Sequence, residues 1–166
     1  MKPKSLIRTL TLSWLFIIIM TSLSGPVMAQ SYNFGVPELE MQVYVQPDAS
    51  ARIVYDITFE NHGSTIDVVD IGTPHRDYDI RNMSATINGV NLTDIRKSEY
   101  IDVGVEVHLG SQAIQRGREG TLHFEFTMPD MVYQDTTDKD LASMQITPTW
   151  FDSSLVRGTG TIRIAV

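Results

Sequence analysis

Apolar and polar residues alternate with a period of two along much of this chain, beginning with two runs separated by a short turn. The first run covers residues 39–45 and the second covers residues 53–59, and every second residue in each is aliphatic or aromatic. Successive side chains of a β-strand point to opposite faces, so this pattern predicts strands with one buried face. Residues 47–50, Pro-Asp-Ala-Ser, are turn formers. The two runs therefore predict an antiparallel hairpin.

The same alternation recurs downstream at intervals typical of an all-β domain. Strands are predicted at residues 66–71, 101–109, 121–127 and 161–166, and a second hairpin is predicted around Asn88-Gly89. The sequence after residue 29 has no extended apolar stripe at i, i+3, i+4 and i+7, so helix is expected to be a minor component. About seven or eight short strands favour an all-β fold, an antiparallel β-sandwich of the immunoglobulin-like kind, with a barrel as the alternative.

Two segments fit this pattern less well. Residues 128–154 show no periodicity and contain Pro129 and Pro148, yet they carry too many apolar side chains for a disordered segment. We expect them to cross the sandwich and to contain a short strand near residues 144–147. The sequence also ends inside the alternation of residues 161–166. That ending predicts either a strand that closes the sheet or a chain that is the N-terminal part of a longer protein.

The beginning of the chain has a different pattern, which indicates that the protein is exported. A basic start is followed by the apolar residues 10–20 and by a turn-prone stretch that ends in Val27-Met28-Ala29. This order is typical of a secretory signal peptide. The apolar run is shorter than the roughly 20 residues of a membrane-spanning helix, although an uncleaved N-terminal anchor is the alternative. We predict a signal peptide over residues 1–29, cleavage before Gln30, and a single domain over residues 30–166.

Composition narrows the expected partners and location of that domain. The chain carries a formal net charge of −7 and contains no cysteine. An acidic surface repels nucleic acid and anionic lipid headgroups, so no nucleic acid partner is expected. Contact with a membrane is expected only through the signal or anchor, or through a further C-terminal segment. An exported domain without disulfides depends on packing for its stability. We expect it in an extracellular, periplasmic or cell-surface location, either free or membrane-anchored.

Three aromatic residues of the aperiodic segment are the candidate ligand-binding residues, namely Tyr133, Trp150 and Phe151. Exposed aromatic side chains anchor protein partners and stack on ligand rings, including sugars. A platform of this kind predicts a protein or a glycan at the cell surface as the partner. The alternative is that Trp150 and Phe151 fill one open end or edge of the sandwich.

Three carboxylates of the same segment, Asp135, Asp138 and Asp140, are the candidate metal ligands. Ca²⁺ takes about six to eight oxygen ligands, and acidic loops of this type supply them. The EF-hand pattern is absent because the loop lacks its turn glycine and its closing glutamate. A solvated acidic loop without a metal is the alternative, and the sequence indicates no other cofactor.

The histidines and serines give weaker hypotheses. His108 and His123 fall on the polar phase of two predicted strands, beside Glu106 and Glu125. A cross-strand His–Glu contact is expected if these strands pair. The sequence shows no HExxH or comparable ligand spacing, so the histidines are expected to be solvated surface residues. Nucleophilic catalysis has little support, because the chain has neither a cysteine nor a GxSxG elbow.

Residues 46–59, QPDASARIVYDITF, together with residues 70–74, DIGTP, carry a likeness to a known family. They resemble the start of an uncharacterised prokaryotic family of predicted membrane proteins, whose members show a PDGSA-like turn before a YxITF-like strand. The resemblance implies a signal peptide, an N-terminal β-rich exported domain and later transmembrane segments, and the family has no assigned catalytic residues to carry over to this chain. Ala49 stands where that family has glycine.

Together these patterns favour a non-enzymatic exported β-sandwich that acts as an interaction or structural module at the cell envelope, such as the ectodomain of a membrane protein. Binding is expected at residues 128–154. A carbohydrate- or Ca²⁺-binding module is the alternative function, and a small hydrolase is a third hypothesis.

Overall fold

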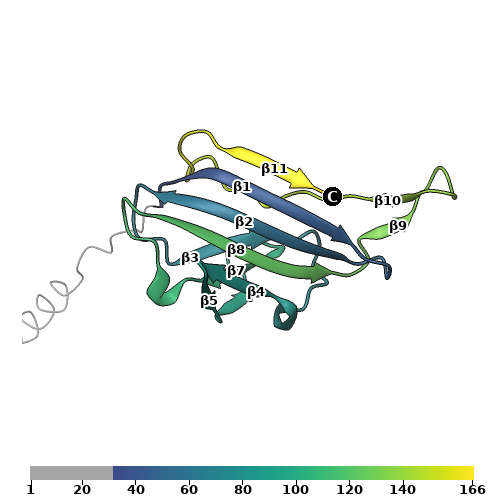
Figure 1. Cartoon of the computed structure of the whole chain (residues 1–166), viewed down its shortest axis with the longest axis horizontal. Helices are drawn as coiled ribbons and strands as arrows, with labels where there is room; N and C mark the ends of the chain where they lie inside the picture. Colours follow the sequence, from purple (N-terminus) through teal and green to yellow (C-terminus); the bar gives the residue numbers. More distant parts are fainter. Residues whose placement is uncertain (1–31) are drawn as a thin grey trace, which may run out of the picture. The chain divides into compact units, whose positions relative to one another are not determined.

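Strands dominate residues 32–166, the part of the chain that the structure, a computed structural model, describes (Figure 1). The predicted signal peptide lies outside the described residues. Helix in the described part is limited to two short 3-10 segments, η1 (Ile80–Asn82) and η2 (Gly110–Gln112). None of the helices in residues 32–166 is long and apolar enough to cross a membrane.

The strands form two main sheets and a separate hairpin. The larger sheet has six strands in the order β11-β1-β2-β8-β4-β5. Its members are β1 (Phe34–Val45), β2 (Ala51–Asn61), β4 (Ser84–Ile87), β5 (Val90–Leu92), β8 (Glu119–Met128) and β11 (Thr161–Ala165). The second sheet has the order β3-β7-β6, with β3 (Val68–Gly72), β6 (Ile95–Lys97) and β7 (Gly104–His108). The hairpin pairs β9 (Val132–Gln134) with β10 (Ala142–Met144).

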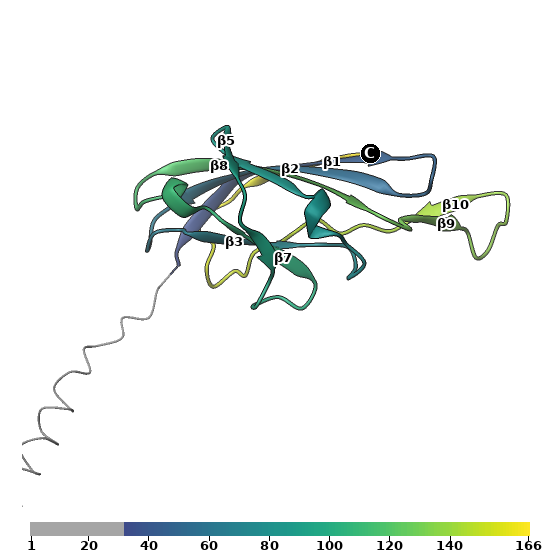
Figure 2. The same cartoon turned by 90° about the horizontal axis from the view of Figure 1, so that it is seen from below.

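The two main sheets pack face to face, and Figure 2 shows β3 and β7 below the large sheet. One apolar core lies between them, to which both sheets contribute buried side chains such as Ile57, Phe124, Ile71 and Val105. Both sheets keep open edges among the described strands. The prediction of an all-β sandwich is therefore confirmed, and the barrel alternative is not what the described strands form.

The first predicted hairpin is confirmed, with β1 and β2 antiparallel over nearly their whole length. The turn closes through Ala49, whose N–H donates to the Gln46 carbonyl at 3.1 Å. Asp48 supports this turn by accepting hydrogen bonds from the N–H and the hydroxyl of Ser50. Ala49 has φ of +68°, a left-handed conformation that favours glycine.

The second predicted hairpin is confirmed as well. Asn88 and Gly89 link β4 to β5, and their φ angles are +50° and +79°. Two central residues with positive φ are what a two-residue type I′ turn requires, and Asn-Gly supplies them at low steric cost.

The predicted strand over residues 101–109 is shorter than expected. Only Gly104–His108 forms a strand, because residues 98–103 make a loop in which the Ser98 hydroxyl accepts hydrogen bonds from the N–H groups of Tyr100 and Ile101. The cross-strand His–Glu contact depended on pairing of the His108 and His123 strands, and these strands do not pair. β7 pairs with β3 and β6, whereas β8 pairs with β2 and β4, so the two histidines lie in different sheets.

The predicted strand at the end of the chain is β11, which pairs with β1 in parallel at the edge of the large sheet. Gly160 allows this approach, since a Cβ there would lie 1.9 Å from the Val36 carbonyl oxygen. The expectation of one buried face in this strand is wrong: Ile162 is 61% exposed and Ile164 is 48% exposed. The core face is therefore covered at Leu39 and Met41 of β1 but not at the paired residues of β11.

The aperiodic segment contains more regular structure than the sequence predicts. Its short strand lies at Ala142–Met144 rather than at residues 144–147, and it forms the β9–β10 hairpin that projects beyond the end of the two sheets (Figures 1 and 2). The chain then returns along the sandwich. The buried Thr149 contacts both layers, because its N–H donates to the Tyr55 hydroxyl and its hydroxyl accepts from the Gly72 N–H, each at 3.0 Å.

Candidate functional site

The three candidate aromatic residues have different environments. Phe151 packs edge-on against Phe34 and Phe59, with ring centroids 5.7 and 5.4 Å away, and therefore extends the core. Trp150, its neighbour in sequence, is 75% exposed, and Tyr133 on β9 is 48% exposed. Ring contacts among the described residues join neither Trp150 nor Tyr133 to Phe151. Phe151 thus packs in the core, as the alternative to a binding platform predicts, whereas Trp150 and Tyr133 are exposed.

Two of the three candidate carboxylates, Asp135 and Asp138, accept backbone hydrogen bonds in the loop between β9 and β10. Asp135 accepts hydrogen bonds from the N–H groups of Thr137 and Asp138 and from the Ser143 hydroxyl, and these bonds lower the pKa of its carboxyl. Asp138 in turn accepts from the Asp140 N–H at 3.0 Å. Within residues 32–166, His, Asp and Glu side chains form no group of three that could hold a metal ion. Binding of Ca²⁺ by this loop stays a prediction.

Both strand histidines contact carboxylates, each within its own sheet. The His108 Nε2 lies 2.8 Å from Glu106 Oε1, on the same strand. The His123 Nδ1 lies 2.8 Å from Asp56 Oδ1, on the neighbouring strand of the large sheet. His108 thus contacts its neighbour in sequence, whereas His123 does not contact Glu125, which pairs with Arg52. The two pairs lie in different sheets and form no common site.

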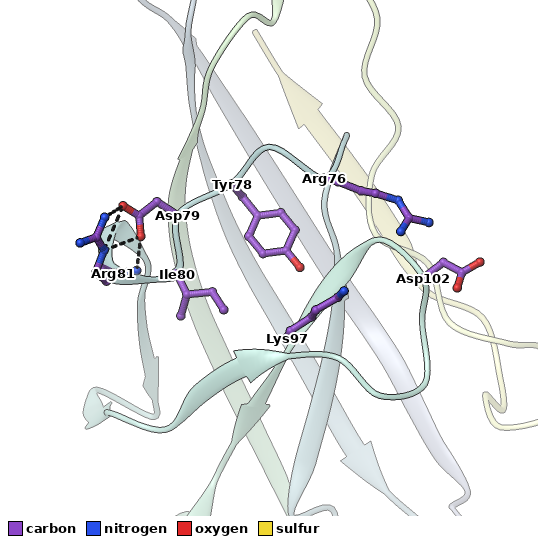
Figure 3. A pocket seen from close by; sticks show the side chains of 7 residues that line it. All are labelled: Arg76, Tyr78, Asp79, Ile80, Arg81, Lys97 and Asp102. Atoms are coloured by element: carbon purple, nitrogen blue, oxygen red, sulfur yellow. Dashed lines mark hydrogen bonds and ion pairs between the residues drawn. The ribbon is translucent and has the colours of Figure 1, made fainter.

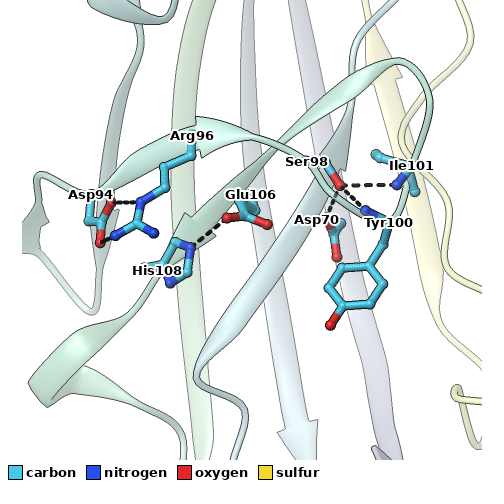
Figure 4. Close-up of polar contacts among 8 residues, drawn as sticks. All are labelled: Asp70, Asp94, Arg96, Ser98, Tyr100, Ile101, Glu106 and His108. Carbon is cyan, nitrogen blue, oxygen red and sulfur yellow. Dashed lines mark hydrogen bonds and ion pairs between the residues drawn. The ribbon is translucent and has the colours of Figure 1, made fainter.

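The outer face of the three-stranded sheet holds a polar cluster that the sequence analysis did not identify (Figure 4). Asp70 on β3 lies directly opposite Glu106 on β7. Burial raises the pKa of the Asp70 carboxyl, against the opposing effect of the hydrogen bond from Ser98. The hydrogen bond with His108 lowers the pKa of Glu106. Two carboxyl groups of like charge therefore face each other. Asp70 is hydrogen-bonded to Ser98, and Glu106 is hydrogen-bonded to His108.

An apolar strip lies along the free edge of the large sheet. Ile162 and Ile164 are paired with Leu39 and Met41 of β1, so the four side chains share the core face of the sheet. Leu39 and Met41 are buried, whereas Ile162 and Ile164 are exposed. The core face of the sheet is thus exposed to solvent at its last strand, β11.

A polar hollow of about 530 Å³ opens beside the second sheet (Figure 3). The loop between β3 and β4 contributes Arg76, Tyr78 and the Asp79–Arg81 pair, while the β6–β7 region contributes Lys97 and Asp102. Asp79 and Arg81 form a bidentate ion pair, with contacts of 2.9 and 2.7 Å, which lowers the pKa of the Asp79 carboxyl. Tyr78 donates its hydroxyl hydrogen to the Gly104 carbonyl at 2.8 Å.

No protein-family model matches this chain, and no curated protein matches it. Two surfaces of the described chain are suited to binding: the apolar edge at β11 and the hollow beside the second sheet.

Proposed function

We propose that this protein is an exported, non-enzymatic interaction module of the cell envelope, which binds an extended segment of a partner protein along the free edge of β11. The observation that carries the proposal is the exposure of Ile162 and Ile164 on the core face of the sheet, 61% and 48%, beside Leu39 and Met41 at 3% and 1%. Removing such apolar surface from water stabilises association.

The backbone of β11 supports the same mode of binding. β11 pairs with β1 on one side, and its other edge pairs with no strand among the described residues. A free edge presents unpaired N–H and C=O groups that can add a strand from another chain. Natural sheets often protect such edges with charged side chains. The charged residue of β11, Arg163, points to the opposite face, where it contacts Glu38 and Glu40 at 3.0 and 2.8 Å.

The expected complex therefore has two components of recognition. Backbone hydrogen bonds to the partner strand give affinity that is independent of sequence, while the apolar side chains that pack on Ile162 and Ile164 give selectivity. The exposed Val166 extends the same apolar surface. The partner is expected to be an extended segment with alternating apolar residues.

The proposal is tested by placing a photo-crosslinking amino acid at Ile164 and irradiating the protein in the envelope of its host. A discrete adduct with one partner protein is expected. The matched control carries the same amino acid at Thr127, an exposed residue on the outer face of β8, and should give no such adduct. Equal labelling from both positions, or none from Ile164, would contradict the proposal.

The exported location is tested separately. The mass of the protein recovered from the exported fraction should correspond to a chain that begins at Gln30. Recovery of the protein only from the cytoplasm would contradict export, and with it the proposal that β11 binds its partner in the cell envelope.

A further inference from the structure

Two cationic side chains that line the hollow beside the second sheet, Arg76 and Lys97, are not held in an ion pair within residues 32–166, and Asp102 lies on the same side of the hollow. Arg81 is occupied by Asp79, but neither Arg76 nor Lys97 forms an ion pair with another residue in the described part of the chain. We propose that this hollow binds an acidic saccharide, a sugar ring that carries a carboxylate. This site is distinct from the β11 edge and does not depend on it.

Arg76 and Lys97 are the groups that would bind the carboxylate. Figure 3 shows both side chains on the same side of the hollow, away from the Asp79–Arg81 pair. The chain as a whole carries a net charge of −7, so its general field repels anions. An acidic ligand is favoured only where cations remain unpaired, and charge-assisted hydrogen bonds to a carboxylate are stronger than neutral ones.

The position of Lys97 on β6 directs it towards the hollow. Lys97 pairs with Val105, which is buried in the core, so Lys97 lies on the core face of this edge strand rather than on the outer face of Arg96 and Glu106. A charge in this position also discourages pairing of β6 with another strand. The two roles give different results when the charge is removed: loss of ligand binding in one case and self-association in the other.

The remaining lining residues match a sugar better than a simple anion. The Tyr78 ring lies between the two sets of charged groups in Figure 3, and the bond from its hydroxyl to Gly104 fixes its orientation. An oriented aromatic ring gives a surface on which a sugar ring can stack. Asp102, on the same side as Arg76, would accept hydrogen bonds from sugar hydroxyls. The volume of about 530 Å³ lies within the range of small-ligand sites.

The test is a titration of the ¹⁵N-labelled protein, followed by NMR, with three probes. They are digalacturonate, its dimethyl ester and inorganic phosphate. We expect digalacturonate to shift the signals of residues that line the hollow and to bind at least about tenfold more tightly than either other probe. Equal binding of the ester would overturn the role of the carboxylate. Equal binding of phosphate would overturn the saccharide, and no binding of digalacturonate would overturn the site.

Variants locate the binding within the hollow. Lys97→Met and Arg76→Gln should each weaken digalacturonate binding by about tenfold, since each removes one charge-assisted contact. Lys139→Met and Arg116→Gln are the matched controls, because both residues are exposed and lie outside the hollow. Thermal unfolding of each variant checks that the fold is retained. Unchanged binding in both hollow variants, or self-association of Lys97→Met with unchanged binding, would overturn the proposal.

Discussion

Strand β2 and strand β11 show the same alternation in sequence and have opposite environments. On β2, the apolar residues Ile53, Ile57 and Phe59 are at most 1% exposed, whereas Ile162 and Ile164 of β11 are about half exposed or more. Both strands belong to one sheet, and their apolar residues share its core face. The difference lies in what covers that face.

This comparison separates two properties that a period of two does not distinguish. Alternation determines that a segment suits a strand with one apolar face. Burial of that face depends on a second layer, which other segments of the chain supply through contacts distant in sequence. β2 is covered by the second sheet and by Thr149 and Phe151, whereas Ile162 and Ile164 of β11 stay exposed. An alternating strand that stays exposed has an apolar surface available to a partner.

The largest expected effect comes from shortening one isoleucine in each strand. Ile57→Ala should lower the free energy of unfolding by about 2–5 kcal/mol, because it leaves a cavity in a close-packed core. Ile164→Ala should lower the free energy by only about 1 kcal/mol or less, because about half of this side chain is already exposed and no closed cavity forms. Chemical denaturation of both variants measures the difference. Similar losses in the two variants would show that β11 is covered after all.

The same contrast is expected between two adjacent aromatic residues. Phe151→Ala should destabilise the protein by about 1–3 kcal/mol, since it removes edge contacts with Phe34 and Phe59 together with apolar burial. Trp150→Ala should leave the stability within about 0.5 kcal/mol, because the side chain is 75% exposed. Thermal unfolding of the two single variants shows whether Trp150 and Phe151 contribute equally to stability or whether only Phe151 belongs to the core. A large loss of stability in Trp150→Ala would contradict the assignment of Trp150 to the surface.

The longer strands were predictable because they depend on local pattern, whereas the short strands β6 and β9 carry too few residues to show one. The β1–β2 hairpin and the Asn88-Gly89 turn are each encoded within a few residues, and both are confirmed. The assignment of strands to sheets was not predictable in this way. His108 and His123 lie on strands adjacent in sequence order, yet those strands belong to different layers, since sheet membership depends on how distant segments pack.

The candidate sites were less predictable than the fold. The hollow combines Arg76, Tyr78, Lys97 and Asp102, residues of common types that no motif connects in sequence. Only the paths of the β3–β4 and β6–β7 loops bring them together. The sequence predicts Trp150 and Phe151 either as a platform or as a plug of the sandwich, and nothing in it distinguishes the two residues from each other. The side on which each of these two adjacent residues lies is set by the route of residues 145–156 along the core.

A smaller, stabilising effect is expected at the turn of the buried hairpin. Ala49→Gly should raise the free energy of unfolding by about 0.5–1 kcal/mol, because φ of +68° is strained for alanine and relaxed for glycine. The control is Ala142→Gly on β10, where the backbone is extended and glycine should destabilise by about 0.5–1 kcal/mol. Opposite signs in denaturation experiments are the expected result. Destabilisation in both variants would contradict a left-handed Ala49.

The smallest expected effect tests the outer face of the second sheet, where two carboxylates, Asp70 and Glu106, are held close together with little exposure to solvent. Asp70→Asn should stabilise the protein near neutral pH by roughly 0.2–1 kcal/mol, since it removes a like charge directly opposite Glu106. The Asn oxygen can still accept the hydrogen bond from Ser98.

The sign of this effect with pH follows from the raised pKa of Asp70. A carboxyl whose pKa is higher in the folded than in the unfolded chain binds its proton more tightly when folded, so ionisation costs stability as the pH rises. The advantage of Asp70→Asn should therefore be full above the raised pKa and vanish below the ordinary value of 3.8. Glu106 has a lowered pKa, so Glu106→Gln should behave oppositely, losing stability most above the ordinary value of 4.5. Denaturation across pH 3–7 measures both variants, and an advantage of Asp70→Asn that persists unchanged at pH 3 would contradict the burial of an ionised Asp70.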